Sequence, residues 1–153
     1  MDQKEVWHSA RTAVAAVGSL VIARSCRLPE PYWAAVTTIV IMQSTLGAAW
    51  TVSKQRFAGT ALGAAMGALL TAYTTQNVAA FGFGVFVLGL ICALLRMGRN
   101  AFRYAGITLA IVMLIARAEP AWVIAIHRFL EISVGIAVGL ALTAVWPEPE
   151  PAA

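Results

Sequence analysis

Two arginines, Arg56 and Arg128, each stand directly before a row of glycines, at the expected start of an apolar helix. A guanidinium presents a planar fork that binds a carboxylate through two hydrogen bonds, and a helix N-terminus adds partial positive charge. This combination favours an anion-binding site. Both arginines could instead extend to lipid headgroups as interface anchors. The residues leave both interpretations open.

An acidic residue, Glu131, follows Arg128 by three positions, so the two side chains share one helix face. We favour an ion pair near a membrane boundary. The alternative is that Glu131 carries the proton of a coupled transporter, as acidic residues in apolar segments do.

No arrangement typical of an enzyme is visible. His8 and His127 lie far apart in the sequence, no Ser-His-Asp set can be assembled, and no glycine-rich phosphate loop follows a strand. Cys26 and Cys92 have no spacing typical of a disulfide or a metal site. We therefore expect a protein that is not an enzyme and that holds no metal or cofactor.

The composition indicates the environment of the segments that position these residues. Apolar residues make up 60 % of the 153, and charged residues only 12 %. Such a chain fits a membrane better than water, which excludes a soluble enzyme and a disordered chain. The net charge of +4 is spread through short clusters and forms no continuous stripe, so nucleic acid is not an expected partner.

We predict an all-α integral membrane protein with six transmembrane helices. Two of the apolar segments, Tyr32–Leu46 and Tyr104–Ile115, are shorter than the ~17 residues of a full span, so they must tilt, thin the bilayer or continue past a break. The six segments are Val6–Ala23, Tyr32–Leu46, Phe57–Tyr73, Val78–Leu95, Tyr104–Ile115 and Phe129–Trp146.

Polar interruptions follow both short segments, and short apolar pieces, 48–52 and 121–126, come after them. Interrupted helices at matching positions often mark a transporter's binding site, where Gln43 and Thr45 would donate hydrogen bonds and Arg117 a charge. The alternative is that both segments end at the interface, with Trp50 and Trp122 as belt residues.

An internal repeat explains the matching positions. Offsetting the chain by 72 residues gives 15 identities over residues 24–76, against roughly 5 by chance. With three spans per copy, the second copy, about 78–146, must enter the membrane in the opposite sense to the first, about 6–74. We expect one membrane domain over 1–146, followed by an exposed tail over 147–153 that is rich in proline and glutamate.

Glycines recur every four residues in the third and sixth segments. Such rows let another helix approach closely, and we expect packing within the protomer or across a dimer, although the same faces could line a narrow pathway. The glycines are Gly59, Gly63 and Gly67, repeated as Gly135 and Gly139.

Loop charges predict the orientation. With the N-terminus in the cytoplasm, seven basic residues fall inside and four outside, so we expect both termini in the cytoplasm. The apolar stretch after Arg11 has no clear cleavage site, so we expect the first helix to be retained.

The motifs Pro31-Tyr32-Trp33 and Arg56-x-x-Gly59-Thr60-x-x-Gly63 resemble the fusaric-acid-resistance-like family of the aromatic acid exporter superfamily, with plant aluminium-activated malate transporters as distant relatives. The resemblance covers residues 10–146. It makes Tyr32, Trp33, Arg56, Gly59, Thr60 and Gly63 family-motif positions, and Arg128 with Glu131 resembles a later Arg-x-x-Glu element. It implies a six-helix membrane block that moves organic anions outward. Many bacterial members carry two such blocks and large cytoplasmic domains, whereas one block is visible in this sequence. Two copies of the chain would restore two blocks, and the plant relatives are similarly paired around a pore. The resemblance therefore also implies a homodimer.

We therefore expect an exporter or channel for organic anions, aromatic carboxylates above all, in a bacterial inner membrane. Arg56, Arg128 and Arg117 would attract the anion, and Tyr32 or Trp33 would stack on its ring. Two alternatives stay open: a non-transporting membrane scaffold that binds another protein, and a pump for hydrophobic cations that uses Glu131.

Overall fold

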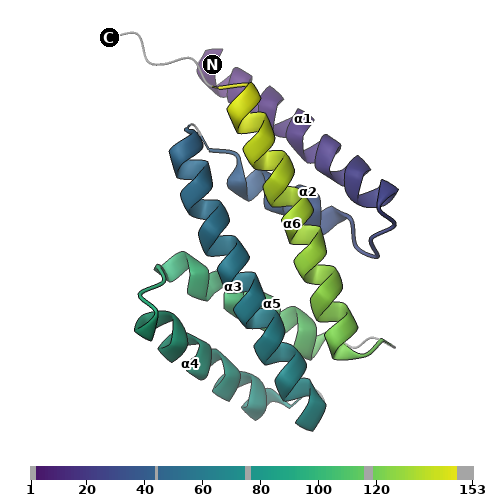
Figure 1. Ribbon diagram of the computed structural model, residues 1–153, viewed down its shortest axis with the longest axis vertical. Helices are drawn as coiled ribbons and strands as arrows, with labels where there is room; N and C mark the ends of the chain where they lie inside the picture. Colours follow the sequence, from purple (N-terminus) through teal and green to yellow (C-terminus); the bar gives the residue numbers. More distant parts are fainter. Residues whose placement is uncertain (1–2, 44, 75–76, 116–118, 148–153) are drawn as a thin grey trace. The chain divides into compact units, whose positions relative to one another are not determined.

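The computed structural model describes residues 3–43, 45–74, 77–115 and 119–147. This part of the chain contains α-helices and no strand, so the all-helical prediction is confirmed (Figure 1). The helices are α1 (Gln3–Ser25), α2 (Tyr32–Ile41), α3 (Leu46–Tyr73), α4 (Val78–Leu94), α5 (Arg99–Leu114) and α6 (Ala121–Val145).

The helix order repeats along the chain. A helix pair, α1 and α2, precedes the long helix α3, and a second pair, α4 and α5, precedes the long helix α6. The two long helices end at Tyr73 and Val145, 72 residues apart. The sequence offset therefore recurs in the helix boundaries.

Both long helices begin earlier than the apolar segments indicated. We expected helices from Phe57 and Phe129, but α3 is continuous from Leu46 and α6 from Ala121. The short apolar pieces 48–52 and 121–126 are the first turns of these helices. Ser, Lys, Gln and Arg at 53–56 carry no helix-breaking residue, so a polar run with good helix propensity was mistaken for a loop.

Capping residues explain where two helices start. The side chain of Asn77 accepts hydrogen bonds from the backbone nitrogens of Ala79 and Ala80 at the start of α4, at 2.9 and 3.2 Å. The Thr45 hydroxyl accepts one from the Ala48 nitrogen, at 3.2 Å, at the start of α3. Both residues satisfy donors that a helix leaves unpaired in its first turn.

Two helices of the described part are long and apolar enough to cross a membrane, Glu5–Ser25 and Ala121–Val145. Many apolar side chains point outward, among them Val17 at 61 % exposed and Phe86 at 65 %. Exposed apolar faces of this extent are typical of a chain whose solvent is lipid. At 1.5 Å per residue, the ten residues of α2 reach only ~15 Å, about half of a bilayer core.

The chain groups into two compact units. The first comprises residues 1–53 and 131–153, and the second comprises residues 54–130. The first unit therefore holds α1, α2 and the C-terminal part of α6. The second holds α4, α5 and most of α3, together with the start of α6.

Glycines set the helix approach inside both units. In the second unit, a Cβ at Gly59 or Gly63 of α3 would overlap the carbonyl oxygen of Ala101 or Ala105 of α5. In the first unit, a Cβ at Gly135 of α6 would overlap the Ala34 carbonyl of α2. Each long helix thus packs against the helix pair of the other repeat.

Candidate functional site

Arg56 lies inside the second unit against an aromatic ring. Its side chain is only 6 % exposed, and its guanidinium carbon is 4.8 Å from the centroid of the Tyr104 ring. A guanidinium at this distance from an aromatic face makes a cation–π interaction. We did not single out Tyr104 from the sequence, although its repeat-equivalent Tyr32 was among the predicted site residues.

The position of Arg56 differs from our expectation. It follows Leu46, the first residue of α3, by ten positions, and Arg128 follows Ala121, the first residue of α6, by seven. Neither arginine is therefore at a helix N-terminus, and partial charge from the helix end cannot assist it, because that effect fades within the first turn. Both arginine side chains are buried, and the choice between an anion site and an interface anchor stays a prediction.

Close packing of α3 and α5 supports the Arg56 side chain. Gly59, one turn after Arg56, would place a Cβ 3.0 Å from the Cβ of Tyr104. The absence of a side chain at Gly59 therefore lets the base of the tyrosine lie against α3. Thr60, four residues after Arg56 and thus on the same face, is 1 % exposed.

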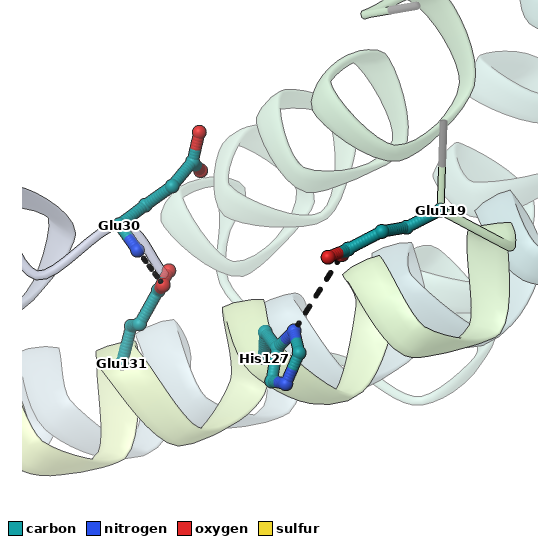
Figure 2. A network of polar contacts seen from close by, with 4 residues as sticks. All are labelled: Glu30, Glu119, His127 and Glu131. Carbon is teal, nitrogen blue, oxygen red and sulfur yellow. Dashed lines mark hydrogen bonds and ion pairs between the residues drawn. The ribbon is translucent and has the colours of Figure 1, made fainter. Parts of the chain in front are cut away.

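Glu131 lies in the first unit and is 1 % exposed. Its Oε1 accepts a hydrogen bond of 2.8 Å from the backbone nitrogen of Glu30, two residues before α2 (Figure 2). A carboxylate there is favourable because the N-terminus of α2 carries partial positive charge. Arg128 is also 1 % exposed. The ion pair between Arg128 and Glu131 stays a prediction.

The structure does not gather the other predicted residues into one place. Tyr32 and Trp33 start α2, with ring centroids 5.7 Å apart, whereas Gln43 and Thr45 lie beyond its other end. The length of α2, ~15 Å, separates the two groups. Gln43 donates from Nε2 to the Val40 carbonyl at 3.0 Å. Arg117 lies outside the described residues.

A buried arginine that we had counted only as a loop charge is Arg11 of α1. It is 0 % exposed and donates to two carbonyl oxygens, those of Gln43 at 2.6 Å and Trp146 at 2.9 Å. These carbonyls follow the C-terminal ends of α2 and α6, where the negative end of the helix dipole attracts a cation. A charge inside the apolar segment Val6–Ala23 was the signal that could have identified it.

His127 of α6 pairs with Glu119 in the second unit. Its Nδ1 is 3.9 Å from Glu119 Oε2, and the carboxylate side chain is 53 % exposed (Figure 2). Among the described residues, no three of His, Cys, Asp and Glu come together as a metal site would require.

An open apolar groove of about 350 Å³ lies along α3 and α6 in the second unit. Alanines of α3 form one side, and Trp122, Ile126 and Phe129 of α6 form the other. None of the described residues that line it carries a charge, so the groove is unsuited to an anion.

The chain matches the family model described as fusaric acid resistance protein-like over residues 14–142. The chain belongs to this family. It is similar to the uncharacterized transporter YdhK of Escherichia coli strain K12, with 31 % identity over 149 residues. The matched YdhK of Salmonella typhimurium strain LT2 is 29 % identical. The match covers 92 % of this chain but only 22 % of each YdhK. No solved structure gave a significant match.

Proposed function

We propose that the chain is a membrane block of a transporter that moves organic anions, with Arg56 as the principal anion-binding residue. The observation that carries this proposal is the buried Arg56 guanidinium, whose carbon lies over the Tyr104 ring at 4.8 Å from its centroid. A guanidinium fork binds a carboxylate through two hydrogen bonds, and inside an apolar helical unit that attraction is much stronger than in water.

The charge distribution supports an anionic substrate. Residues 54–130, which form the second unit, hold seven of the eleven basic residues of the chain and one of its seven acidic residues. That acidic residue, Glu119, is exposed and paired with His127. A low-dielectric region with this excess of positive charge raises the local concentration of anions.

Family membership and the relatives support transport. The fusaric acid resistance protein-like model covers most of the chain, and the relatives that it resembles are named transporters. Aromatic carboxylates are the substrate class that we propose, because they add ring stacking to the charge that Arg56 requires. Arg128 and Thr60, both buried, are the next candidates for contact with the anion.

We further propose the membrane arrangement. The two three-helix repeats are inverted in a bacterial inner membrane, both termini are cytoplasmic, and two protomers pair as a homodimer. The inversion is supported by the 72-residue offset between the ends of α3 and α6 and by the odd number of helices in each repeat.

The test is flux of benzoate and malate from liposomes that hold the purified protein, with and without a pH gradient. We expect benzoate flux in the wild type and at least a tenfold loss in Arg56→Gln. Arg103→Gln is the matched control, because Arg103 has the same charge in the same unit but is exposed. It should retain flux within about twofold.

Three results would redirect the proposal. Equal flux in wild type and Arg56→Gln would overturn the role of Arg56. A folded wild type that moves no anion but co-purifies with another protein would support the scaffold alternative. Flux of a hydrophobic cation that Glu131→Gln abolishes and Arg56→Gln retains would support the cation pump.

A further inference from the structure

The short connection between α4 and α5 carries several exposed arginines. Arg96, Arg99 and Arg103 fall within eight consecutive residues, and all three side chains are exposed. We propose that these three residues, the arginine patch, bind the headgroup of an anionic phospholipid. This inference concerns the lipid around the protein and is independent of the transported anion.

No acidic residue balances the arginine patch. The only acidic residue of the second unit, Glu119, pairs with His127. Among the described residues, no ion pair or side-chain hydrogen bond joins an arginine of the patch to another group. The patch therefore offers three positive charges to a partner outside the chain.

The local structure opposes arginine at these positions. Arg96 has a φ of 51°, a left-handed conformation that glycine usually adopts after a helix. It belongs to a Schellman motif, in which the Met97 nitrogen donates to the Cys92 carbonyl at 2.9 Å. Arg99 and Arg103 lie four residues apart on α5, so their charges repel, and Arg99, the first residue of α5, also opposes the helix dipole. A bound anion offsets both repulsions.

Exposed leucines beside the patch indicate a lipid and not a soluble anion. Leu94 and Leu95, immediately before Arg96, are 83 % and 60 % exposed. Apolar side chains followed at once by arginines match the boundary between acyl chains and headgroups. A phospholipid with net negative charge covers the leucines and neutralises the arginines, whereas free phosphate would leave the leucines uncovered.

The connection is held against α3, so the patch has a fixed support. A Cβ on Gly98 would lie 2.8 Å from Nε2 of Gln55 in α3. The side-chain nitrogen of Asn100 donates to Oε1 of Gln55 at 3.4 Å. These contacts order the backbone between Arg96 and Arg103 in advance, which lowers the entropic cost of binding a headgroup.

The connection between α1 and α2, in the first unit, provides an internal comparison. It also ends a helix on an arginine with positive φ, Arg27 at 55°, and it follows a second exposed arginine, Arg24. Glu30 follows Arg27 by three positions, and Glu131 accepts a hydrogen bond from the Glu30 nitrogen. Two acidic residues accompany these two arginines, so we expect no preference for an anionic lipid there.

Lipid affinity of the purified full chain in detergent, measured by native mass spectrometry, tests the proposal. We expect the Kd for phosphatidylglycerol to be about tenfold or more below that for phosphatidylcholine, which has no net charge. The triple variant Arg96→Gln, Arg99→Gln, Arg103→Gln should raise the Kd for phosphatidylglycerol about tenfold or more, since one arginine near an anionic surface contributes about fivefold. The double variant Arg24→Gln, Arg27→Gln is the matched control and should change this Kd by less than about twofold.

Arg96→Gly separates lipid binding from the stability of the helix end. Glycine relieves the left-handed strain, so the midpoint of thermal unfolding should rise or stay equal. The Kd for phosphatidylglycerol should nevertheless rise about fivefold. Arg27→Gly makes the same backbone change at the end of α1 and should leave the Kd within about twofold of wild type.

Inorganic phosphate distinguishes the lipid from a soluble anion. Excess phosphate, compared with a chloride salt of equal ionic strength, should leave phosphatidylglycerol binding unchanged. Leu94→Gln with Leu95→Gln should weaken that binding although the arginines remain. Displacement of the lipid by phosphate, with no effect of the leucine substitutions, would overturn the proposal in favour of a soluble anion.

The remaining outcomes are equally decisive. Equal affinity of the wild type for the two lipids, or an unchanged Kd in the triple variant, would overturn the proposal. An equal loss in the Arg24→Gln, Arg27→Gln variant would overturn the location of the patch. Loss of lipid preference in a triple variant that keeps its helical circular dichroism spectrum would support it.

Discussion

The rings of Phe57 and Phe129 lie in contact, with centroids 4.8 Å apart and planes at 59°, although the residues are 72 positions apart in the chain. They are also equivalent positions of the internal repeat. Within the second unit, α3 and α6 therefore meet at matching positions of the two copies of the repeat.

The first prediction concerns the energy of this aromatic pair. Phe57→Leu and Phe129→Leu each remove the same ring contact, so the double variant should be less destabilised than the two losses added. We expect a coupling free energy of about 1 kcal/mol from unfolding in mixed micelles with increasing SDS. Phe83→Leu with Phe86→Leu is the control pair. Both rings are more than 60 % exposed, and their effects should simply add.

The second prediction concerns helix approach at Gly63. Gly63→Ala should lower the free energy of unfolding by about 2 kcal/mol, because the added methyl group would overlap the Ala105 carbonyl oxygen and force α3 from α5. Gly106→Ala is the matched control, since no atom lies within 4 Å of its Cβ. It should stabilise the helix by about 0.5 kcal/mol or leave it unchanged. Equal stability of the two variants would contradict the packing.

The third prediction concerns Arg11. Arg11→Gln should lower the free energy of unfolding by about 3 kcal/mol, because the buried carbonyls of Gln43 and Trp146 lose a charged donor. Arg11→Lys keeps the charge but not the fork, so we expect an intermediate loss. Arg24→Gln, at an exposed position of the same helix, is the comparison and should change stability by less than about 1 kcal/mol. A wild-type melting curve for Arg11→Gln would refute this role.

The fourth prediction concerns orientation. Cys26 is exposed and follows α1, whereas Cys92 is buried in α4. With a cytoplasmic N-terminus, a membrane-impermeant maleimide should label Cys26 in intact bacterial cells. Arg99→Cys, in a chain with both native cysteines replaced, should be labelled only after the cells are opened. The reverse pattern would mean that the protein is inserted in the other sense.

The sequence predicted where the helices end better than where they begin. Apolar segments end where polar or proline residues stand, so the C-terminal ends of α1, α3 and α6 lie within two residues of prediction. The start of α3 was wrong because Lys54 and Arg56 were assigned to a loop, and the start of α6 was wrong because Arg128 was assigned to one. A charged residue indicates water only when it is exposed, and Arg56 is buried.

The candidate site was predictable in part. Arg56 stood out because a glycine row follows it, and that row brings α5 close enough for Tyr104 to contact Arg56. Tyr104 did not stand out, because a tyrosine near an expected helix start is as typical of an interface belt as of a site. The position of Arg11 inside an apolar segment could have identified it as buried, but its partners could not be predicted, because backbone carbonyls leave no pattern of residue types.

The packing of each long helix on the other half of the chain has a consequence for fragments of the protein. The glycines of α3 pack on α5, and those of α6 pack on α2, so each half of the chain completes the other half. A fragment that stops before α4 would keep the glycine face of α3 but lose the helix that covers it. We therefore expect neither half to fold when it is produced alone, and both halves to fold when they are produced together.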